Sequence, residues 1–494
     1  MTQVDDGGPR RIETAIPRLD YILHGGFLRA GTYAVQGPPG SGKTILANQI
    51  CFNAMRLQAD MRCVYVTLLV ESHAKMISHL RAMRFFDEAL VPQRMVYVSG
   101  YPALQSQGLT GLLQLLRKTL RAHHAGVLVV DGLESVEQAA TGHQAYREFV
   151  HELQGLATMT DATVFLLSNL RDRAHDENAL VDGVVELSDS LIGPRAVREL
   201  TVHKFRGSDY LRGRHEVAID ASGIVVHPRT EIQFEKPSGH ATEMRKRMPF
   251  GIPSLDQMIG GGLPSGSTTA LLGSPGTGKT ILGLSFLLDG ARSGEPGTYF
   301  GFFEPPPRLI AKSRKLGIDL QPYIDDGLIE IDWHPPLEHM MDSLAEQLLE
   351  PIRQDPRGRR RVFIDGIEGF RTAAVYPERV PRFLSALTNQ LRTLDVTTLV
   401  SEELDLFTPM IQMPNPELGN VVESVILLRY VELRSQLHRL ISILKMRESI
   451  YETSIREFKI TDDGIEVSAS FDTAEQILTG TGIMRGSRSG EGAP

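Results

Sequence analysis

One eight-residue pattern, G-x-x-x-x-G-K-T, occurs twice in this chain, and 236 residues separate the two lysines. Its first copy is Gly37, Pro38, Pro39, Gly40, Ser41, Gly42, Lys43 and Thr44, and its second is Gly273, Ser274, Pro275, Gly276, Thr277, Gly278, Lys279 and Thr280. In such a loop, glycines let backbone N–H groups close around phosphate oxygens, between a strand and the N-terminus of a helix. The chain is therefore predicted to contain two nucleotide-binding domains of one kind.

The similarity between the two halves extends beyond these loops. Upstream, Leu19, Asp20, Gly25 and Gly26 recur 236 residues later as Leu255, Asp256, Gly261 and Gly262. Downstream, the run 127–131 matches 361–365, and Lys204-Phe205-Arg206 matches Lys445-Met446-Arg447. Self-similarity at a nearly constant spacing indicates a duplication.

The duplication sets the expected domain boundaries in this 494-residue chain. We expect an N-terminal domain at 1–228, a linker at 229–248, a C-terminal domain at 249–470 and a flexible tail at 471–494. The linker segment is polar without a clear period, and the tail is rich in Gly and Ser.

Short apolar runs alternate with helical patterns in each half. The runs 127–130 and 164–167 are continuously apolar, as buried parallel strands tend to be. Strands that alternate with helices predict an α/β fold with a mostly parallel sheet flanked by helices.

The bulk composition weighs against several classes of protein. The net charge is −8, whereas nucleic-acid binders usually carry a basic face. Two cysteines give no disulfide framework, which indicates a reducing compartment. No run reaches the roughly 18 apolar residues of a membrane span, and the first residues lack the apolar core of a signal peptide. We expect a cytoplasmic protein that does not bind a membrane.

Residue types around the loops predict a Mg-ATP site in each half. Lys43 and Lys279 would reach the β- and γ-phosphates, and the hydroxyls of Thr44 and Thr280 would hold Mg²⁺. Asp131 and Asp365 each end an apolar run, from which a carboxylate reaches the Mg²⁺ water shell. A strand-end aspartate that caps the following turn is the alternative for either residue alone.

A carboxylate that activates water is expected on the strand next to the loop strand. The candidates are Glu71 and Glu304, and helix capping is the alternative because both precede a helical pattern. The pairs Lys204 with Arg206 and Lys445 with Arg447 lie in strand-like runs, where residues i and i+2 share a face. Each pair would clamp the γ-phosphate of a neighbouring subunit, or else form a charged strand face.

Together these residues resemble the KaiC family, double-domain members of the RecA-like ATPases. The resemblance covers about residues 11–482. It rests on the tandem loops, the Gly-Gly lead-in, Lys204-Phe205-Arg206-Gly207, Tyr430-Val431-Glu432, Lys445-Met446-Arg447, Ile455-Arg456-Glu457-Phe458 and the stretch from Phe471 to Gly480. It implies tandem RecA-like domains in a hexamer of two stacked rings, ATP between subunits, hydrolysis of ATP and a KaiB-like signalling partner.

The sequence departs from the family in two places. Clock members phosphorylate an adjacent Ser-Thr pair in the second domain, and that pair falls here on Gly419 and Asn420. The family also has two adjacent glutamates at the catalytic strand end, where this chain has Val70-Glu71 and Phe303-Glu304. Losing a general base costs about 10²–10⁴-fold in rate.

Four functions follow from these observations. The preferred one is a hexameric ATPase whose hydrolysis or nucleotide state controls partner binding. The alternatives are a Ser/Thr autokinase, which Gly419-Asn420 disfavours, and an ATP-gated scaffold with little turnover. Recombinase-like DNA binding is least favoured, because the segment after residue 167 carries several acids that repel phosphates: Asp172, Asp176, Glu177, Asp182 and Glu186.

Overall fold

A computed structural model describes residues 10–68, 73–169, 180–233, 246–335, 339–404, 419, 421–433, 436–447, 450–462 and 464–468. The chain divides into two compact units, Met1–Ile232 and Gln233–Pro494. This division falls inside the segment 229–248, whose ends are ordered. Thr230–Ile232 forms a 3-10 helix, and β12 (Arg247–Met248) pairs with β13 (Leu263–Pro264). The tail 471–494 lies outside the described residues.

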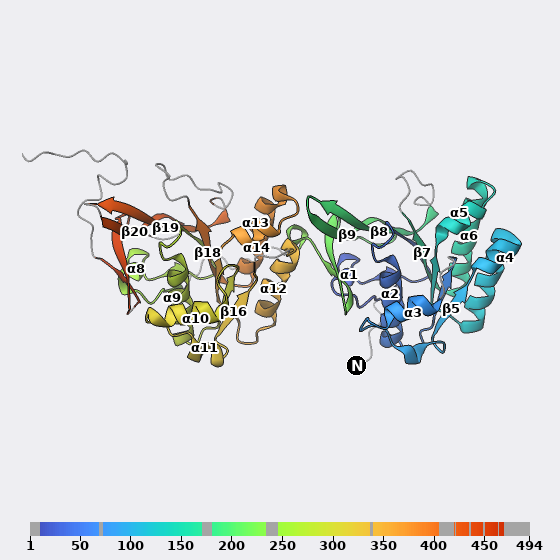
Figure 1. The fold of residues 1–494 in the computed structure, drawn as a ribbon, viewed down its shortest axis with the longest axis horizontal. Helices are drawn as coiled ribbons and strands as arrows, with labels where there is room; N and C mark the ends of the chain where they lie inside the picture. Colours follow the sequence, from blue (N-terminus) through green and yellow to red (C-terminus); the bar gives the residue numbers. More distant parts are fainter. Residues whose placement is uncertain are drawn as a thin grey trace, which may run out of the picture. The chain divides into compact units, whose positions relative to one another are not determined.

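The first unit is built on a nine-stranded sheet in the order β11-β10-β9-β8-β3-β7-β6-β4-β5 (Figure 1). Strands β5, β4, β6, β7, β3 and β8 are parallel to one another, and β9, β10 and β11 extend the sheet antiparallel. The strands are β3 (Thr32–Gln36), β4 (Cys63–Thr67), β5 (Met95–Ser99), β6 (Val127–Asp131), β7 (Thr163–Ser168), β8 (Gly183–Ile192), β9 (Arg195–Phe205), β10 (Arg214–Asp220) and β11 (Gly223–His227). A short ribbon of β1 (Arg11–Ile12) and β2 (Phe27–Leu28) precedes them.

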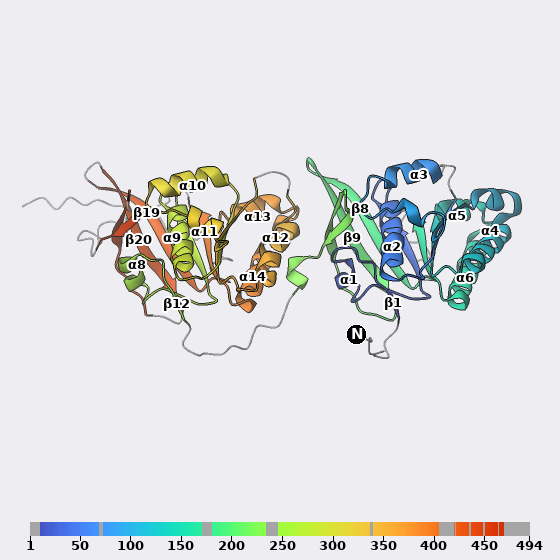
Figure 2. The ribbon, with the colours of Figure 1, turned by 90° about the horizontal axis from the view of Figure 1, so that it is seen from below.

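Helices cover both faces of this sheet (Figures 1 and 2). Successive residues of the central strand β3 face opposite sides of the sheet. Tyr33 and Val35 join the core made with α2, whereas Ala34 joins the core made with α4 and α6. This two-sided burial is why all five residues of β3 are buried. The helices are α1 (Leu19–Ile22), α2 (Lys43–Leu57), α3 (His73–Leu80), α4 (Tyr101–His123), α5 (Leu133–Ala139) and α6 (His143–Thr160).

The second unit repeats this topology with the strand order β16-β15-β17-β18-β14-β19-β20-β21-β22. Its loop strand β14 again lies between two parallel neighbours, β18 and β19, and β19 to β22 pair antiparallel. The strands are β14 (Thr268–Gly273), β15 (Gly297–Gly301), β16 (Ile329–Trp333), β17 (Arg361–Asp365), β18 (Thr397–Glu403), β19 (Ser424–Leu433), β20 (Gln436–Met446), β21 (Arg456–Thr461) and β22 (Gly464–Val467). The prediction of two α/β domains, each a mostly parallel sheet flanked by helices, is confirmed.

The helices of the second unit also form two layers. Apolar residues of α9 pack on one face of the sheet, and those of α12 and α14 pack on the other. The helices are α8 (Pro253–Met258), α9 (Lys279–Arg292), α10 (Pro306–Lys315), α11 (Gln321–Asp325), α12 (Met341–Gln354), α13 (Glu368–Ala373) and α14 (Val380–Thr393). No helix among the described residues of either unit is long and apolar enough to cross a membrane.

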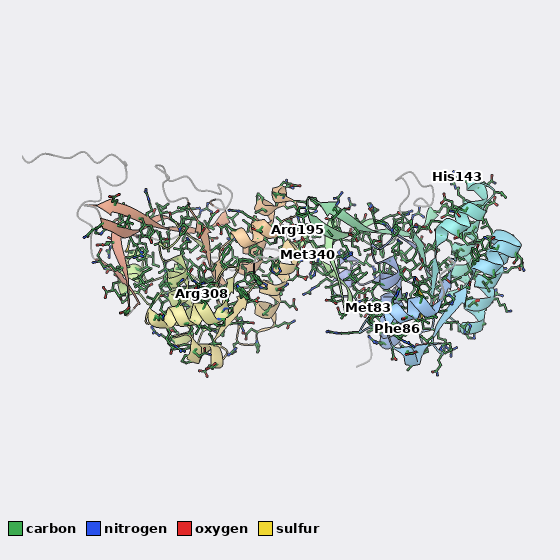
Figure 3. The ribbon with its side chains drawn as sticks, viewed as in Figure 1. Met83, Phe86, His143, Arg195, Arg308 and Met340 are labelled. Carbon is green, nitrogen blue, oxygen red and sulfur yellow. The ribbon has the colours of Figure 1, made fainter. Side chains whose placement is uncertain are left out.

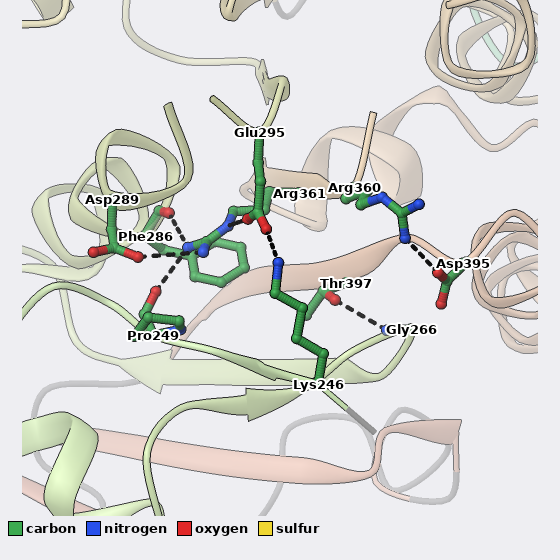
Figure 4. Close-up of polar contacts among 10 residues, drawn as sticks. All are labelled: Lys246, Pro249, Gly266, Phe286, Asp289, Glu295, Arg360, Arg361, Asp395 and Thr397. Carbon is green, nitrogen blue, oxygen red and sulfur yellow. Dashed lines mark hydrogen bonds and ion pairs between the residues drawn. The ribbon is translucent and has the colours of Figure 1, made fainter. Parts of the chain in front are cut away.

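A buried arginine anchors the start of β17, the strand that ends at Asp365 (Figure 4). The Arg361 side chain is only 2% exposed and pairs with Asp289 at 3.2 Å and with Glu295 at 3.0 Å. Its guanidinium also donates to the carbonyls of Pro249 and Phe286, at 2.7 and 2.8 Å. All of its charge is thereby compensated inside the unit, as a buried ion requires.

Candidate nucleotide sites

The first phosphate-binding loop connects β3 to α2. Gly40 and Gly42 adopt φ values of 85° and 103°, which only glycine adopts without strain, and α2 begins at the next residue, Lys43. The Lys43 ammonium donates to the carbonyls of Gly37 and Pro38 at 2.7 and 3.0 Å. The loop therefore curls around its lysine at a helix N-terminus, the geometry that receives phosphate.

The second loop, between β14 and α9, has the same geometry. Gly276 and Gly278 have φ values of 77° and 108°, and Lys279 Nζ donates to the Gly273 carbonyl at 2.7 Å. The Tyr430 hydroxyl, from β19, donates to the Gly276 carbonyl at 2.6 Å and fixes the loop from outside. Burial lowers the pKa of both lysines, so a phosphate beside either ammonium would stabilise its charged form.

A hydroxyl and a carboxylate meet beside each loop. Thr44 Oγ1 lies 3.4 Å from Asp131 Oδ2, and Thr280 Oγ1 lies 2.9 Å from Asp365 Oδ2. These oxygen donors suit Mg²⁺, which takes one or two protein ligands and completes its shell with water and phosphate. The described residues contain no cluster of three or more His, Cys, Asp or Glu side chains arranged to hold a metal.

A tyrosine orients each of these carboxylates. Tyr65 donates to Asp131 Oδ2 at 2.6 Å, and Tyr299 donates to Asp365 Oδ2 at 2.9 Å. Burial raises the pKa of Asp131, although its hydrogen bonds from Tyr65 and Thr44 act in the opposite direction. Neither tyrosine was predicted from the sequence. They recur at the 234-residue offset of the aspartates, and that offset could have identified them.

A cavity lies beside each loop. The first has a volume of about 430 Å³ and is lined by Thr44 and Asp131 together with apolar side chains that include Met83, which Figure 3 labels. The second, about 320 Å³, is lined by Lys279, Thr280 and Asp365 among others. Both volumes lie within the range of small-molecule sites.

Glu304 lines the second cavity, but its strand is not where we expected it. It follows β15, and β17 and β18 lie between β15 and the loop strand β14, so the prediction of a neighbouring strand is wrong. Sequence neighbours need not be sheet neighbours, because a crossover helix lets the chain skip strand positions. Glu304 still reaches the cavity because the carboxyl ends of parallel strands open at one edge of the sheet. Its counterpart Glu71 lies outside the described residues.

Basic residues of α10 hold the Glu304 carboxylate. Lys312 Nζ lies 3.0 Å from Oε2, and Arg308 Nε lies 3.6 Å from Oε1 (Arg308 is labelled in Figure 3). The preceding residue, Phe303, is 60% exposed and also lines the cavity. The segment that follows β15 therefore places one aromatic ring, Phe303, and one carboxylate, Glu304, beside the cavity.

The Lys-x-Arg pairs lie elsewhere in each unit. Lys204 is in β9 and Lys445 in β20, and Arg206 and Arg447 follow the ends of these strands. Lys445 Nζ donates to the carbonyls of Gly419 and Val422, at 2.7 and 2.8 Å. Among the described residues that line the two cavities, none belongs to either pair.

Comparison with known proteins agrees with this geometry. The family model described as KaiC, an ATPase family, matches residues 12–231 and 248–471, one match in each half. The circadian clock oscillator protein KaiC of Picosynechococcus sp. is 25% identical over 487 residues, which cover 96% of this chain and 92% of that protein. KaiC 1 of Synechocystis sp. is 24% identical with the same coverage, and KaiC of Thermostichus vulcanus is 26% identical over 97% of this chain and 93% of its own length. The chain belongs to the KaiC ATPase family.

Proposed function

We propose that this chain binds Mg-ATP in both units and hydrolyses it, and that the nucleotide state controls its binding to a partner protein. The observation that carries the proposal is the duplicated site, in which a phosphate-binding loop, a threonine hydroxyl and a strand-end carboxylate meet in each unit. Membership of an ATPase family also supports ATP binding and hydrolysis.

Each residue type has a role in this proposal. The loop amides with Lys43 or Lys279 bind the phosphates, and Thr44 with Asp131 or Thr280 with Asp365 hold Mg²⁺. When bound, Mg²⁺ neutralises charge on the β- and γ-phosphate oxygens. Tyr65 and Tyr299 keep the carboxylates aimed at the threonines.

Water activation falls to Glu71 in the first unit and to Glu304 in the second. Lys312 and Arg308 already contact the two carboxylate oxygens of Glu304, so a water molecule would have to compete with both cations for them. We therefore propose slower turnover in the second unit. If neither unit turns over, an ATP-gated scaffold is the second candidate, which Phe303 at the catalytic strand end also favours.

We further propose a homo-oligomer, a hexamer of two stacked rings, with a KaiB-like or other signalling protein as partner. The Lys204–Arg206 and Lys445–Arg447 pairs support this assembly, since they do not line the cavity of their own unit and would serve a neighbour's nucleotide. Autophosphorylation is not proposed, because Gly419 and Asn420 carry no hydroxyl.

The test is steady-state phosphate release from Mg-ATP by the wild type, Lys43→Ala, Lys279→Ala and the double variant. We expect the double variant to lose release, and Lys43→Ala to lose the larger share. Release by the double variant at the wild-type rate would refute the proposal. A parallel incubation with γ-labelled ATP separates hydrolysis from autokinase activity, since label on the protein would support the latter.

A further inference from the structure

The two units differ at one position beside their loops. In the first unit Asn169 directly follows β7, whose Ser168 is in register with Gln36, the last residue of β3. In the second unit Glu403 is in register with Gly273, the first glycine of the loop and the counterpart of Gly37. Asn169 and Glu403 therefore stand at the same register position, one with an amide and the other with a carboxylate.

Backbone contacts confirm the equivalence of these two residues. The Asn169 amide N–H donates to Oε1 of Glu134, and the Glu403 N–H donates to Oε1 of Glu368 at 3.0 Å. Glu134 and Glu368 each lie three residues after the metal-side aspartate of their unit. Asn169 and Glu403 therefore occupy the same position relative to the phosphate-binding loop of their unit.

Both side chains contact the lysine of their loop. Lys43 Nζ donates to Asn169 Oδ1 at 3.3 Å, and Lys279 Nζ lies 3.9 Å from Glu403 Oε1. Because this ammonium reaches the β- and γ-phosphates, a group within 4 Å of it lies close to the γ-phosphate. An amide can donate a hydrogen bond to a phosphate oxygen there, whereas a carboxylate can only accept one and carries a like charge.

Lys279 is the cation that lies beside Glu403, at 3.9 Å. The Glu403 side chain is 57% exposed, and the nearby carboxylates of Asp365 and Glu304 line the same cavity. Lys312, which also lines this cavity, pairs with Glu304 at 3.0 Å. A γ-phosphate would therefore compete with Glu403 for Lys279.

We propose that Glu403 sets the nucleotide preference of the second unit, disfavouring a γ-phosphate and so shifting that unit toward nucleoside diphosphate relative to the first. The inference rests on the proposed function, since it assumes that Lys279 binds nucleotide phosphate. Both units still bind Mg-ATP in this proposal, but the second unit prefers ATP over ADP less strongly than the first, which has Asn169 at the same position.

The experiment measures the affinities of full-length protein for ADP and for a non-hydrolysable β,γ-imido ATP, by competition with fluorescent ADP in the presence of Mg²⁺. A Lys43→Ala background reports the second unit, and a Lys279→Ala background reports the first. Two like charges that contact the same ammonium near a protein surface repel each other even after screening, so we expect roughly tenfold effects.

Glu403→Gln is expected to raise the affinity for the imido analogue relative to ADP by about tenfold. Glu403→Asp keeps the charge and should preserve the parental ratio. The reciprocal change, Asn169→Asp in the Lys279→Ala background, should lower the ratio in the first unit by a similar factor. The matched control is Glu378→Gln, which removes an exposed carboxylate outside the cavity lining.

An unchanged ratio in Glu403→Gln, with binding still lost in the Lys43→Ala Lys279→Ala double variant, would overturn the inference and leave the proposed function intact. Loss of phosphate release in Glu403→Gln at an unchanged ratio would also overturn it, since that result assigns water activation to Glu403. Binding that does not depend on Lys279 would overturn the inference together with the second nucleotide site.

Discussion

Replacing Arg361 with methionine tests how the second unit is held together beneath its nucleotide site. The change removes the guanidinium and leaves Asp289 and Glu295, whose side chains are only 20% and 12% exposed, without their shared partner. Removing one partner of a buried ion pair costs about 3–5 kcal/mol. Because both acids keep some solvent and Glu295 keeps Lys246, we expect a loss of about 3 kcal/mol in the free energy of unfolding.

Arg360 provides the matched control, since it is the neighbouring arginine and also forms an ion pair (Figure 4). Its pair with Asp395 is 54% and 61% exposed, and exposed pairs contribute about 0–1 kcal/mol. Arg360→Met should therefore change the unfolding free energy by less than about 1 kcal/mol.

The assay is urea unfolding followed by the fluorescence of Trp333, the only tryptophan of the chain. It lies at the end of β16 and so reports the second unit alone. Equal stabilities of Arg361→Met and Arg360→Met would refute the reasoning, because they would mean that the buried network adds nothing beyond a surface pair.

Three further predictions follow from the same structure. Burial acts to raise the pKa of Glu295, but Lys246 and Arg361 together outweigh burial and lower that pKa. The stability that the ionised Glu295 provides is therefore present above its unfolded pKa of about 4.3, and it is lost as the pH falls through the lower folded value. Urea titrations of Glu295→Gln and wild type should accordingly differ most at neutral pH and converge below about pH 4. Gly290→Ala should destabilise the second unit by about 1–3 kcal/mol in the Trp333 assay, because its Cβ would lie 2.5 Å from Cδ and Nε of Arg361. Glu304→Gln in the Lys43→Ala background should lower the remaining phosphate release by about 10²-fold or more, and an unchanged rate would remove Glu304 from catalysis.

The sequence predicted those parts of the site that depend on short stretches of the chain. The two loops, their lysines and the threonines follow from one motif, and the strand-end positions of Asp131 and Asp365 follow from the apolar runs before them. The pairing of Glu304 with Arg308 and Lys312 could also have been predicted, since Arg308 and Lys312 share one face of α10 and Glu304 lies two residues before that helix begins.

Features that depend on strand order were not predictable in this way. The position of β15 relative to β14 is set by which strands the crossovers skip, and no local pattern records it. The contact of Glu403 with Lys279 arises from the parallel register of β14 and β18, two segments more than a hundred residues apart. Likewise, the run Arg357, Arg359, Arg360 and Arg361 gives no sign that its last member is the buried one.

Equilibrium measurement of bound nucleotide per chain tests the claim of two sites most directly. Full-length protein would be incubated with labelled ADP and Mg²⁺ at saturation, beside Lys43→Ala, Lys279→Ala and the double variant. Two duplicated sites predict about two nucleotides bound per wild-type chain, one in each single variant and none in the double variant. One nucleotide per wild-type chain, lost in only one of the single variants, would contradict a nucleotide site in each unit.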